Sequence, residues 1–307
     1  MIGDGKLFIG GIERSGTTLL GASLARFVAG LVVPEANFKA ALISSDGSQH
    51  DKLLRLQTNF RYRIWNLDST GVADSVTRGM SIYDAIVHEA KTTFPSLPNS
   101  RLIIDHTPDN LAKASVIDEG YHPLAFFYVI RDPRATVLSI MRTDWGLPSI
   151  RSAIEFWCRR YEEDLRGLEH LQAKSTDRLR VVRYEDLCMD AETTVNSAIE
   201  GMRLPINNGG QSGLLVPRYT ASQHNRLFRP VVDLQSWKHA LTASELAYIV
   251  EATRHAWFAR KYFFEDETKA TNPALPFSDR MREFRKPIHR ASAHLRRRRR
   301  GLEAIII

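Results

Sequence analysis

Cysteine and long apolar runs are what this chain of 307 residues has least of. Its two cysteines, Cys158 and Cys188, form no C-x-x-C pair and lie near no histidines at zinc-finger spacing, which argues against a disulfide framework or a structural zinc. No apolar run is long enough to span a membrane, and the first residues lack the charged and apolar segments of a secretory leader. We therefore expect a cytoplasmic protein with reduced cysteines and no metal, long enough to fold around its own core.

Acidic residues are fewer than basic ones, 35 against 42, which gives a formal net charge of +7. Part of the excess is a run of five arginines from Arg296 to Arg300. A positive balance favours an anionic ligand or surface, but it does not distinguish nucleic acid, nucleotide and phospholipid.

Short apolar runs rich in β-branched and aromatic residues occur at 7–9, 102–104, 124–130 and 179–184, and residues 32–34 resemble the end of a further strand. Each of the four runs is followed by a polar cluster and a helical pattern, which is typical of buried parallel strands. The sequence therefore predicts an α/β protein with a central, mainly parallel sheet flanked by helices. Ligands of such sheets bind at the carboxyl ends of the strands, where Arg14, His106 and Arg131 fall.

Helical patterns connect and follow these strands. Apolar residues three and four apart predict a helix over 150–168, and the sequence Thr-Ala-Ser-Glu from Thr242 predicts a capping box and a helix that extends to about Trp257. The more polar segment 40–100 contains candidate helices at 50–66 and 80–92. We expect this segment to be an insertion.

The first predicted strand leads into the sequence Gly-Ile-Glu-Arg-Ser-Gly-Thr-Thr at 11–18. A strand, a glycine-rich turn and a helix bring backbone N–H groups and a helix N-terminus to one phosphate, and Gly11 and Gly16 permit the tight turn. The spacing is that of a Walker loop, except that Thr17 stands where the lysine should be. A nucleotide triphosphatase needs that lysine, whereas the cation of Arg14 and the amides suit a less charged phosphosulfate. A turn that binds nothing is the alternative.

A second phosphate motif lies at 127–139, where a strand ends on Arg131 and Ser139 follows eight residues later in the next helix. An arginine fork and a hydroxyl near a helix start suit a dianionic phosphate. The alternative for Arg131 is an ion pair with a carboxylate such as Asp132. We expect Arg134 to be a surface or ion-pairing residue, and Arg142 to be a further phosphate contact.

Together these motifs resemble the sulfotransferase family. Residues 8–19 are similar to its 5′-phosphosulfate loop, and their sequence is most similar to that of the tyrosylprotein branch. Residues 127–139 resemble its 3′-phosphate motif. Residues 182–187 resemble the family's strand and acidic turn, so Tyr184 either packs near the nucleotide or belongs to the core. The resemblance implies a three-layer, P-loop-like fold and the sulfuryl donor 3′-phosphoadenosine 5′-phosphosulfate (PAPS), without a metal. It also implies that a set of loop residues contacts the cofactor: Arg14, Ser15, Gly16, Thr17 and Thr18.

Two residues are candidates for the chemistry of sulfuryl transfer. Glu35 follows Arg14 by 21 residues, which resembles the spacing to the catalytic glutamate of the tyrosylprotein branch, although it could be a solvated loop residue. His106 stands where family members often carry a lysine. It could donate to the leaving oxygen, act as the base itself or only be a spacer. The base is therefore either Glu35 or His106, with Arg14 assisting.

A looser match covers the region in which the family closes a loop over the nucleotide. It adds three candidate cofactor contacts, any of which could instead be a polar surface residue: Ser222, Arg226 and Lys238.

The resemblance implies in-line transfer of a sulfuryl group to an acceptor hydroxyl of a carbohydrate, peptide, lipid or small molecule. The alternative is a P-loop kinase or nucleotide triphosphatase with 102–105 as its Walker B strand, against which the missing lysine and the Arg131 and Ser139 pair argue. We expect a sulfotransferase domain at 1–265, in which the helical insertion 40–100 covers the acceptor site.

The remaining residues, 266–307, should form an extended or disordered basic tail. For this tail we expect peripheral association with anionic membrane at the inner membrane surface, and no nucleic-acid binding. The sequence leaves the oligomeric state open.

Overall fold

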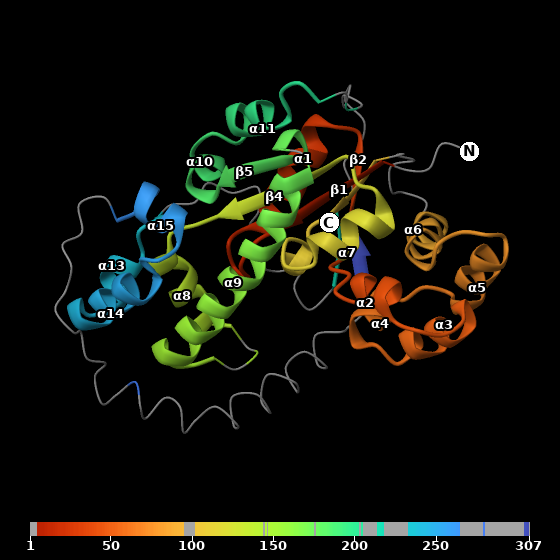
Figure 1. Ribbon diagram of the computed structural model, residues 1–307, viewed down its shortest axis with the longest axis horizontal. Helices are drawn as coiled ribbons and strands as arrows, with labels where there is room; N and C mark the ends of the chain where they lie inside the picture. The colour runs from red at the N-terminus through yellow and green to blue at the C-terminus, as the bar shows by residue number, and fades with distance from the viewer. Residues whose placement is uncertain are drawn as a thin grey trace.

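The computed structural model describes residues 5–94, 102–143, 145, 147–174, 176–202, 204, 214–217, 233–264, 279 and 304–306. Its centre is a parallel sheet of five strands in the order β2-β3-β1-β4-β5 (Figure 1). The strands are β1 Gly5–Gly10, β2 Gly30–Val33, β3 Leu102–Asp105, β4 Ala125–Ile130 and β5 Leu179–Arg183. The predicted α/β fold with a parallel sheet is confirmed.

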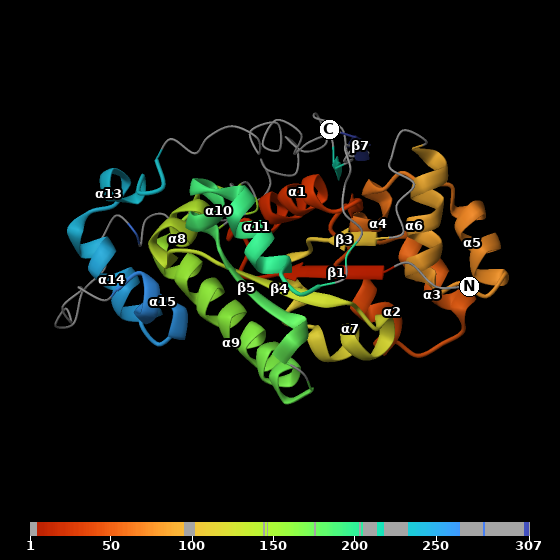
Figure 2. The same ribbon diagram turned by 90° about the horizontal axis from the view of Figure 1, so that it is seen from above.

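Helices cover both faces of the sheet, which explains why its strands are almost continuously apolar. Leu7 and Ile9 of β1 pack on one face with α1 (Thr17–Phe27), α10 (Tyr184–Met189) and α11 (Ala191–Ile199), whereas Phe8 faces the opposite core. That opposite core is covered by α7 (Ala114–Tyr121), α8 (Pro133–Met141) and α9 (Ile150–Lys174). Figure 2 shows α1 and α11 on one side of the sheet and α7 and α9 on the other.

The helix predicted at 150–168 is confirmed as α9, and the capping box at Thr242 is confirmed at the start of α14 (Ala243–Thr253). The extension of that helix to Trp257 is wrong, because α14 ends at Thr253 and a separate helix, α15 (Trp257–Tyr262), begins after a turn. The backbone N–H of Trp257 donates to the hydroxyl of Tyr161 at 3.2 Å, which satisfies one open donor of the new helix.

The described residues between β2 and β3, which end at residue 94, contain five short helices. They are α2 (Lys39–Ser44), α3 (Gln49–Gln57), α4 (Phe60–Ile64), α5 (Ser69–Thr77) and α6 (Ile82–Thr93). The candidate helix at 80–92 corresponds to α6, and that at 50–66 is divided into α3 and α4. The break falls at Asn59, whose side chain accepts the N–H of Arg61 at 2.9 Å and so caps α4. Figure 1 shows these helices gathered at one end of the molecule, opposite α13 (Trp237–Ala240), α14 and α15.

Two described parts of the predicted tail contact the rest of the protein. Asp279 is buried, and its carboxylate accepts the N–H of Ile150 at 2.7 Å at the start of α9. The strand β7 (Ala304–Ile306) pairs antiparallel with β6 (Leu215–Pro217), and Leu214, just before β6, bridges to Val32 of β2. The domain boundary at 265 stays a prediction, and the five arginines at 296–300 lie outside the described residues.

In the described part of the chain, no helix has both the length and the apolar character needed to cross a bilayer. The same residues contain no group of three or more histidine, cysteine, aspartate and glutamate side chains that could hold a metal ion.

Candidate active site

The loop between β1 and α1 depends on backbone positions that only glycine suits. Gly11 and Gly16 have φ of 146° and 105°, in the region that favours glycine. A Cβ at Gly11 would lie 2.5 Å from the carbonyl oxygen of Val129, and one at Gly16 would collide with the ring of Tyr184. The loop is therefore packed closely against β4 and the start of α10.

The N-terminus of α1 is open to an anion. Gly16 provides no side-chain cap, and the first turn contains no acidic residue. The first N–H groups of a helix have no intrahelical acceptor, so those that begin at Thr17 can donate to a phosphate or sulfate. The side chain of Ser15 is buried, and its N–H donates to the carbonyl of Ile12 at 3.0 Å.

The two predicted phosphate motifs meet at Arg14. Its Nε donates to Oγ of Ser139 at 3.1 Å, and its carbonyl accepts from Nη1 of Arg131 at 2.8 Å. Arg14 itself has a φ of 74°, which is unusual for a residue with a side chain and is held by these contacts. The loop cation, the strand-end arginine and the helix serine thus form one hydrogen-bonded group.

The alternative partner for Arg131 does not hold. The carboxylate of Asp132 accepts the N–H of Arg134 at 2.8 Å as the cap of α8, and it forms an ion pair with the Arg134 guanidinium at 2.9 Å. Arg134 is thus an ion-pairing residue, but it is buried rather than on the surface. Arg131 lies instead over the ring of Tyr184, 4.1 Å from the guanidinium carbon to the ring centroid.

Tyr184 begins α10 rather than ending the strand, and its ring lies against Gly16 of the loop. Burial raises its pKa to about 12, so the phenol is neutral at physiological pH. A neutral ring under Arg131 and against Gly16 can orient the guanidinium without neutralising its charge.

The remaining predicted cofactor contacts are Arg142, Lys238, Ser222 and Arg226. Arg142 is exposed at the end of α8, and Lys238 lies over the ring of Trp237 on α13, 5.6 Å from its centroid. Ser222 and Arg226 lie outside the described residues.

Glu35 and His106 follow neighbouring strands. The register pairs Val33 of β2 with Asp105 of β3, so both candidates leave the sheet at the same edge. Glu35 is half-buried, and its Oε2 lies 3.1 Å from Nη1 of Arg61 on α4. An insertion helix therefore reaches the candidate base.

His106 is buried beside the N-terminus of α1. Its Nδ1 lies 3.3 Å from Oγ1 of Thr18, and its Nε2 has no hydrogen-bond partner among the described residues. Burial lowers the pKa of His106, while the nearby Glu35 charge opposes that effect. The imidazole is therefore neutral at pH 7, and it can give or accept one proton.

A buried network fixes the spacing between these two residues. The carboxylate of Asp105 accepts from Nζ of Lys39 at 3.3 Å, from the hydroxyl of Tyr83 at 2.7 Å and from the hydroxyl of Thr107 at 2.5 Å. The Thr107 hydroxyl in turn accepts the N–H of Ala36 at 2.8 Å. The neighbours of Glu35 and His106 are thus bonded to each other, and the Asp105 carboxylate has structural partners instead of the open position that a Walker B aspartate needs.

Lys39, Arg61 and Arg160 carry long-range contacts to the site that the sequence analysis missed. For Lys39 a weak signal existed, because the aspartate that ends a buried strand needs a buried cation or several donors.

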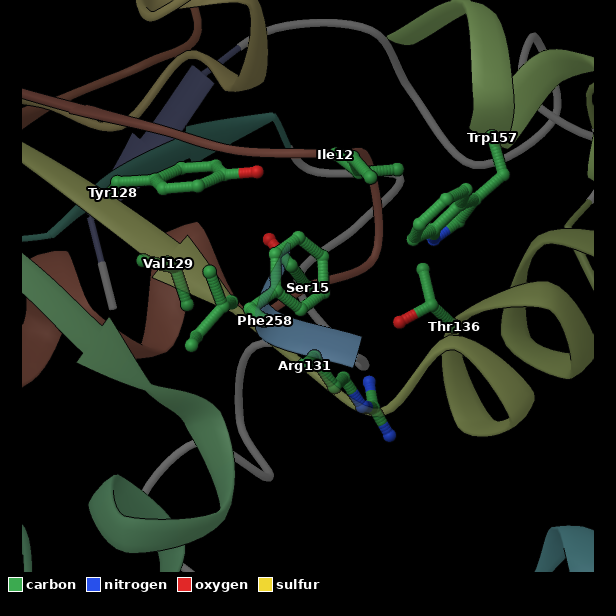
Figure 3. Close-up of a pocket in the computed structure, with 9 residues that line it drawn as sticks. Ile12, Ser15, Tyr128, Val129, Arg131, Thr136, Trp157 and Phe258 are labelled. Carbon is green, nitrogen blue, oxygen red and sulfur yellow. The ribbon is translucent and has the colours of Figure 1, made fainter. Parts of the chain in front are cut away.

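A narrow crevice lies behind the loop (Figure 3), with walls that are mostly apolar. In Figure 3 the Arg131 guanidinium points away from Trp157 and Ile12. The crevice is lined by Ile12, Ser15, Tyr128, Val129, Ile130, Arg131, Thr136, Trp157 and Phe258. The loop therefore rests on a support that is mostly apolar, into which Ile12 and Ser15 of the loop are packed.

Comparison with known proteins gives one family match. The model of the sulfotransferase family matches residues 6–208, and no curated protein matches the chain. Among solved structures, the sulfotransferase domain from the curacin biosynthetic pathway is 17% identical, with 92% of this chain and 96% of that chain covered and a TM-score of 0.45. The sulfotransferase domain of the Synechococcus PCC 7002 olefin synthase is 19% identical, with 91% and 92% covered and a TM-score of 0.44. A mouse sulfotransferase, SULT7A1, complexed with PAP, is 11% identical, with 86% and 89% covered and a TM-score of 0.46.

Proposed function

Since the chain belongs to the sulfotransferase family, we propose that the group around Arg14 binds PAPS and that Glu35 and His106 assist transfer of its sulfuryl group to an acceptor hydroxyl. The open N-terminus of α1 and the Arg14 guanidinium would hold the 5′-phosphosulfate. Arg131 and Ser139 would hold the 3′-phosphate.

The observation that carries this proposal is the contact between the two phosphate motifs. Arg14 and Ser139 are 125 residues apart in the chain, yet their side chains are hydrogen-bonded, and Arg131 binds the Arg14 carbonyl. A ligand with anionic groups at two ends suits two arginines and a helix N-terminus held together in this way. A triphosphate with magnesium suits the site less, because the loop has no lysine.

Glu35 is the better candidate for the general base. It is half-buried and in contact with the insertion, so an acceptor hydroxyl under the insertion could reach it. His106 is buried next to Thr18 at the start of α1, on the side where the phosphosulfate would bind. We assign His106 to hydrogen bonding at the bridging oxygen that leaves, for which a neutral imidazole with a proton on Nε2 is suited.

The reaction would then proceed in line. The acceptor oxygen attacks the sulfur as Glu35 removes its proton, and the bond from sulfur to the bridging oxygen breaks to release adenosine 3′,5′-bisphosphate (PAP). Removing water and holding the three partners in line is the main contribution of such a site.

Thermal stabilisation by PAP, compared with ATP and magnesium, tests the proposed cofactor. We expect PAP to stabilise the protein and ATP with magnesium to have little effect. Stabilisation by ATP with magnesium alone would refute the proposal and favour a kinase or nucleotide triphosphatase. Transfer of labelled sulfate from PAPS to panels of carbohydrates, peptides, lipids and small alcohols would identify the acceptor.

The cellular setting is part of the proposal. Cytoplasmic location and chemistry without a metal agree with the two unpaired cysteines and with Arg14 as the loop cation. The arginines at 296–300 would give weak association with anionic membrane, about 1 kcal/mol for each arginine near the surface. Replacing all five with glutamine in the full chain should reduce binding to phosphatidylserine vesicles, and unchanged binding would reject this part.

A further inference from the structure

Glu13 presents a problem for an anion-binding loop. It lies directly before Arg14, and a carboxylate at this position repels a phosphosulfate unless something neutralises it. Its side chain does not extend into solvent, since its exposed fraction is 26% and its Oε2 lies 3.1 Å from Nε of Arg160. Arg160 belongs to α9, 147 residues further along the chain.

Arg160 is buried on the inner side of the loop. Its side chain is 8% exposed, and it also contacts Glu163 and lies 3.8 Å from Asp164. One guanidinium therefore faces three carboxyl groups, of which Asp164 is completely buried without a hydrogen-bond partner among the described residues. Burial raises the pKa of Asp164 well above its usual range, and it also raises the pKa of Glu13, which the Arg160 charge lowers.

The contact with Arg160 also bears on the conformation of Arg14. A residue other than glycine at a φ of 74° is strained, and such strain persists only where neighbouring contacts determine it. Arg131 holds the carbonyl of Arg14 from one side, and Arg160 holds the preceding side chain from the other. Contacts therefore hold the residue before Arg14 through its side chain and the peptide after Arg14 through its carbonyl.

From these contacts we propose that Arg160 is a positioning residue, which neutralises Glu13 and holds the loop so that Arg14 and the amides at the start of α1 meet the 5′ end of the nucleotide. The inference rests on the proposed function, because it assigns Arg160 to the same nucleotide site. Arg160 acts through Glu13 and does not itself touch the ligand.

A double-mutant cycle separates this role from a general loss of packing. In Arg160→Gln the Glu13 carboxylate loses its counter-charge, so the affinity for PAP should fall about tenfold. Glu13→Gln removes the repulsive charge and keeps a side-chain oxygen that can accept from Nε of Arg160, so it should bind PAP at least as tightly as the unaltered protein. The double variant should bind PAP more tightly than Arg160→Gln, because the uncompensated carboxylate is then absent. Calorimetric titration with PAP measures all four proteins.

Control variants keep the inference testable if Arg160→Gln is unstable. Arg159→Gln changes the exposed neighbour on the same helix and should leave PAP affinity unchanged. Arg160→Lys keeps the charge and should retain more affinity for PAP than Arg160→Gln. Relative to the unaltered protein, Arg160→Lys should raise KM for PAPS and leave kcat unchanged. If Arg160→Gln does not fold, the inference stands or falls on Arg160→Lys combined with Glu13→Gln, whose PAP affinity should exceed that of Arg160→Lys.

The outcomes distinguish this inference from the function on which it rests. If the unaltered protein does not bind PAP, the proposed function fails. If the unaltered protein binds PAP, two results would refute the positioning role of Arg160. One is that Arg160→Gln binds PAP as tightly as the unaltered protein, and the other is that Arg160→Gln and the double variant lose the same amount of affinity.

Discussion

Removing the hydroxyl of Thr107 should destabilise the protein and slow catalysis without weakening nucleotide binding. This hydroxyl donates to Asp105 at 2.5 Å and accepts the N–H of Ala36 at 2.8 Å, in a completely buried position. In Thr107→Val, Asp105 loses a hydrogen bond worth about 1.5–3 kcal/mol, and the Ala36 amide is left buried and unsatisfied at a cost of about 1–3 kcal/mol. The added methyl group returns about 1 kcal/mol. We expect the free energy of unfolding to fall by about 2–4 kcal/mol.

Thr107→Ser is the matched control, because it keeps the hydroxyl and removes only a methyl group, which costs about 1 kcal/mol. Urea denaturation of both variants measures the difference. Since Ala36 adjoins Glu35, Thr107→Val should also lower kcat while PAP affinity changes less than about twofold. Equal unfolding free energies for the two variants would refute the role assigned to the hydroxyl.

The same variant should be more sensitive to acid. Burial by itself raises the pKa of Asp105, but Lys39 and the hydrogen bonds from Thr107 and Tyr83 lower it below the ordinary value of 3.8. The contribution of Asp105 to stability is therefore present above pH 3.8, and is lost as pH falls towards the pKa in the folded protein. In Thr107→Val one of the groups that lower this pKa is missing, so acid unfolding should begin at a higher pH.

Four further substitutions test the site and its support. Replacing Arg131 or Arg14 by alanine should weaken PAP binding about 10- to 100-fold, since each removes charged hydrogen bonds, and unchanged titration curves would reject the phosphate site. His106→Gln should lower kcat about 100-fold at constant PAP affinity. Because burial lowers the pKa of His106 below 6.5, the unfolded state binds its proton first, so His106→Gln should lose less stability than the unaltered protein as pH falls below 6.5. Asp279→Ala removes the acceptor for the N–H of Ile150, so the free energy of unfolding measured by urea denaturation should fall by about 1–2 kcal/mol. Asp279→Asn keeps an oxygen that can accept, and an equal fall for both variants would show that the acceptor contributes little.

The parts of the site that the sequence predicted are those that depend on local patterns. The glycine loop, the strand that ends on Arg131 and the spacing to Ser139 each occupy fewer than about fifteen residues, and apolar strands have a recognisable pattern. Neighbouring parallel strands bring these segments together whatever the length of chain between them. The meeting of Arg14 with Ser139 therefore follows from the fold class.

The charge pairs that hold the site in place could not be predicted in this way. Lys39 lies 66 residues from Asp105, and Glu13 lies 147 residues from Arg160, so no periodicity links the partners. The alternative partner proposed for Arg131, Asp132, shows the same difficulty at short range. Its carboxylate caps α8 and is therefore directed at Arg134, a preference that depends on where the helix begins.

The central place of β1 divides the sheet into two halves that lead to different candidate residues. On one side, β4 and β5 lead to Arg131 and Tyr184, while on the other side β3 and β2 lead to His106 and Glu35. The helices α2–α6 are inserted only between β2 and β3, on the second side. In such a layout, residues 39–93 can be exchanged for another insertion without altering β4 and α8, which position Arg131 and Ser139, provided that the new segment keeps the donors that Lys39 and Tyr83 give to Asp105. If the insertion covers the acceptor site as proposed, chimaeras that swap this segment should change their range of acceptors and keep their affinity for PAP.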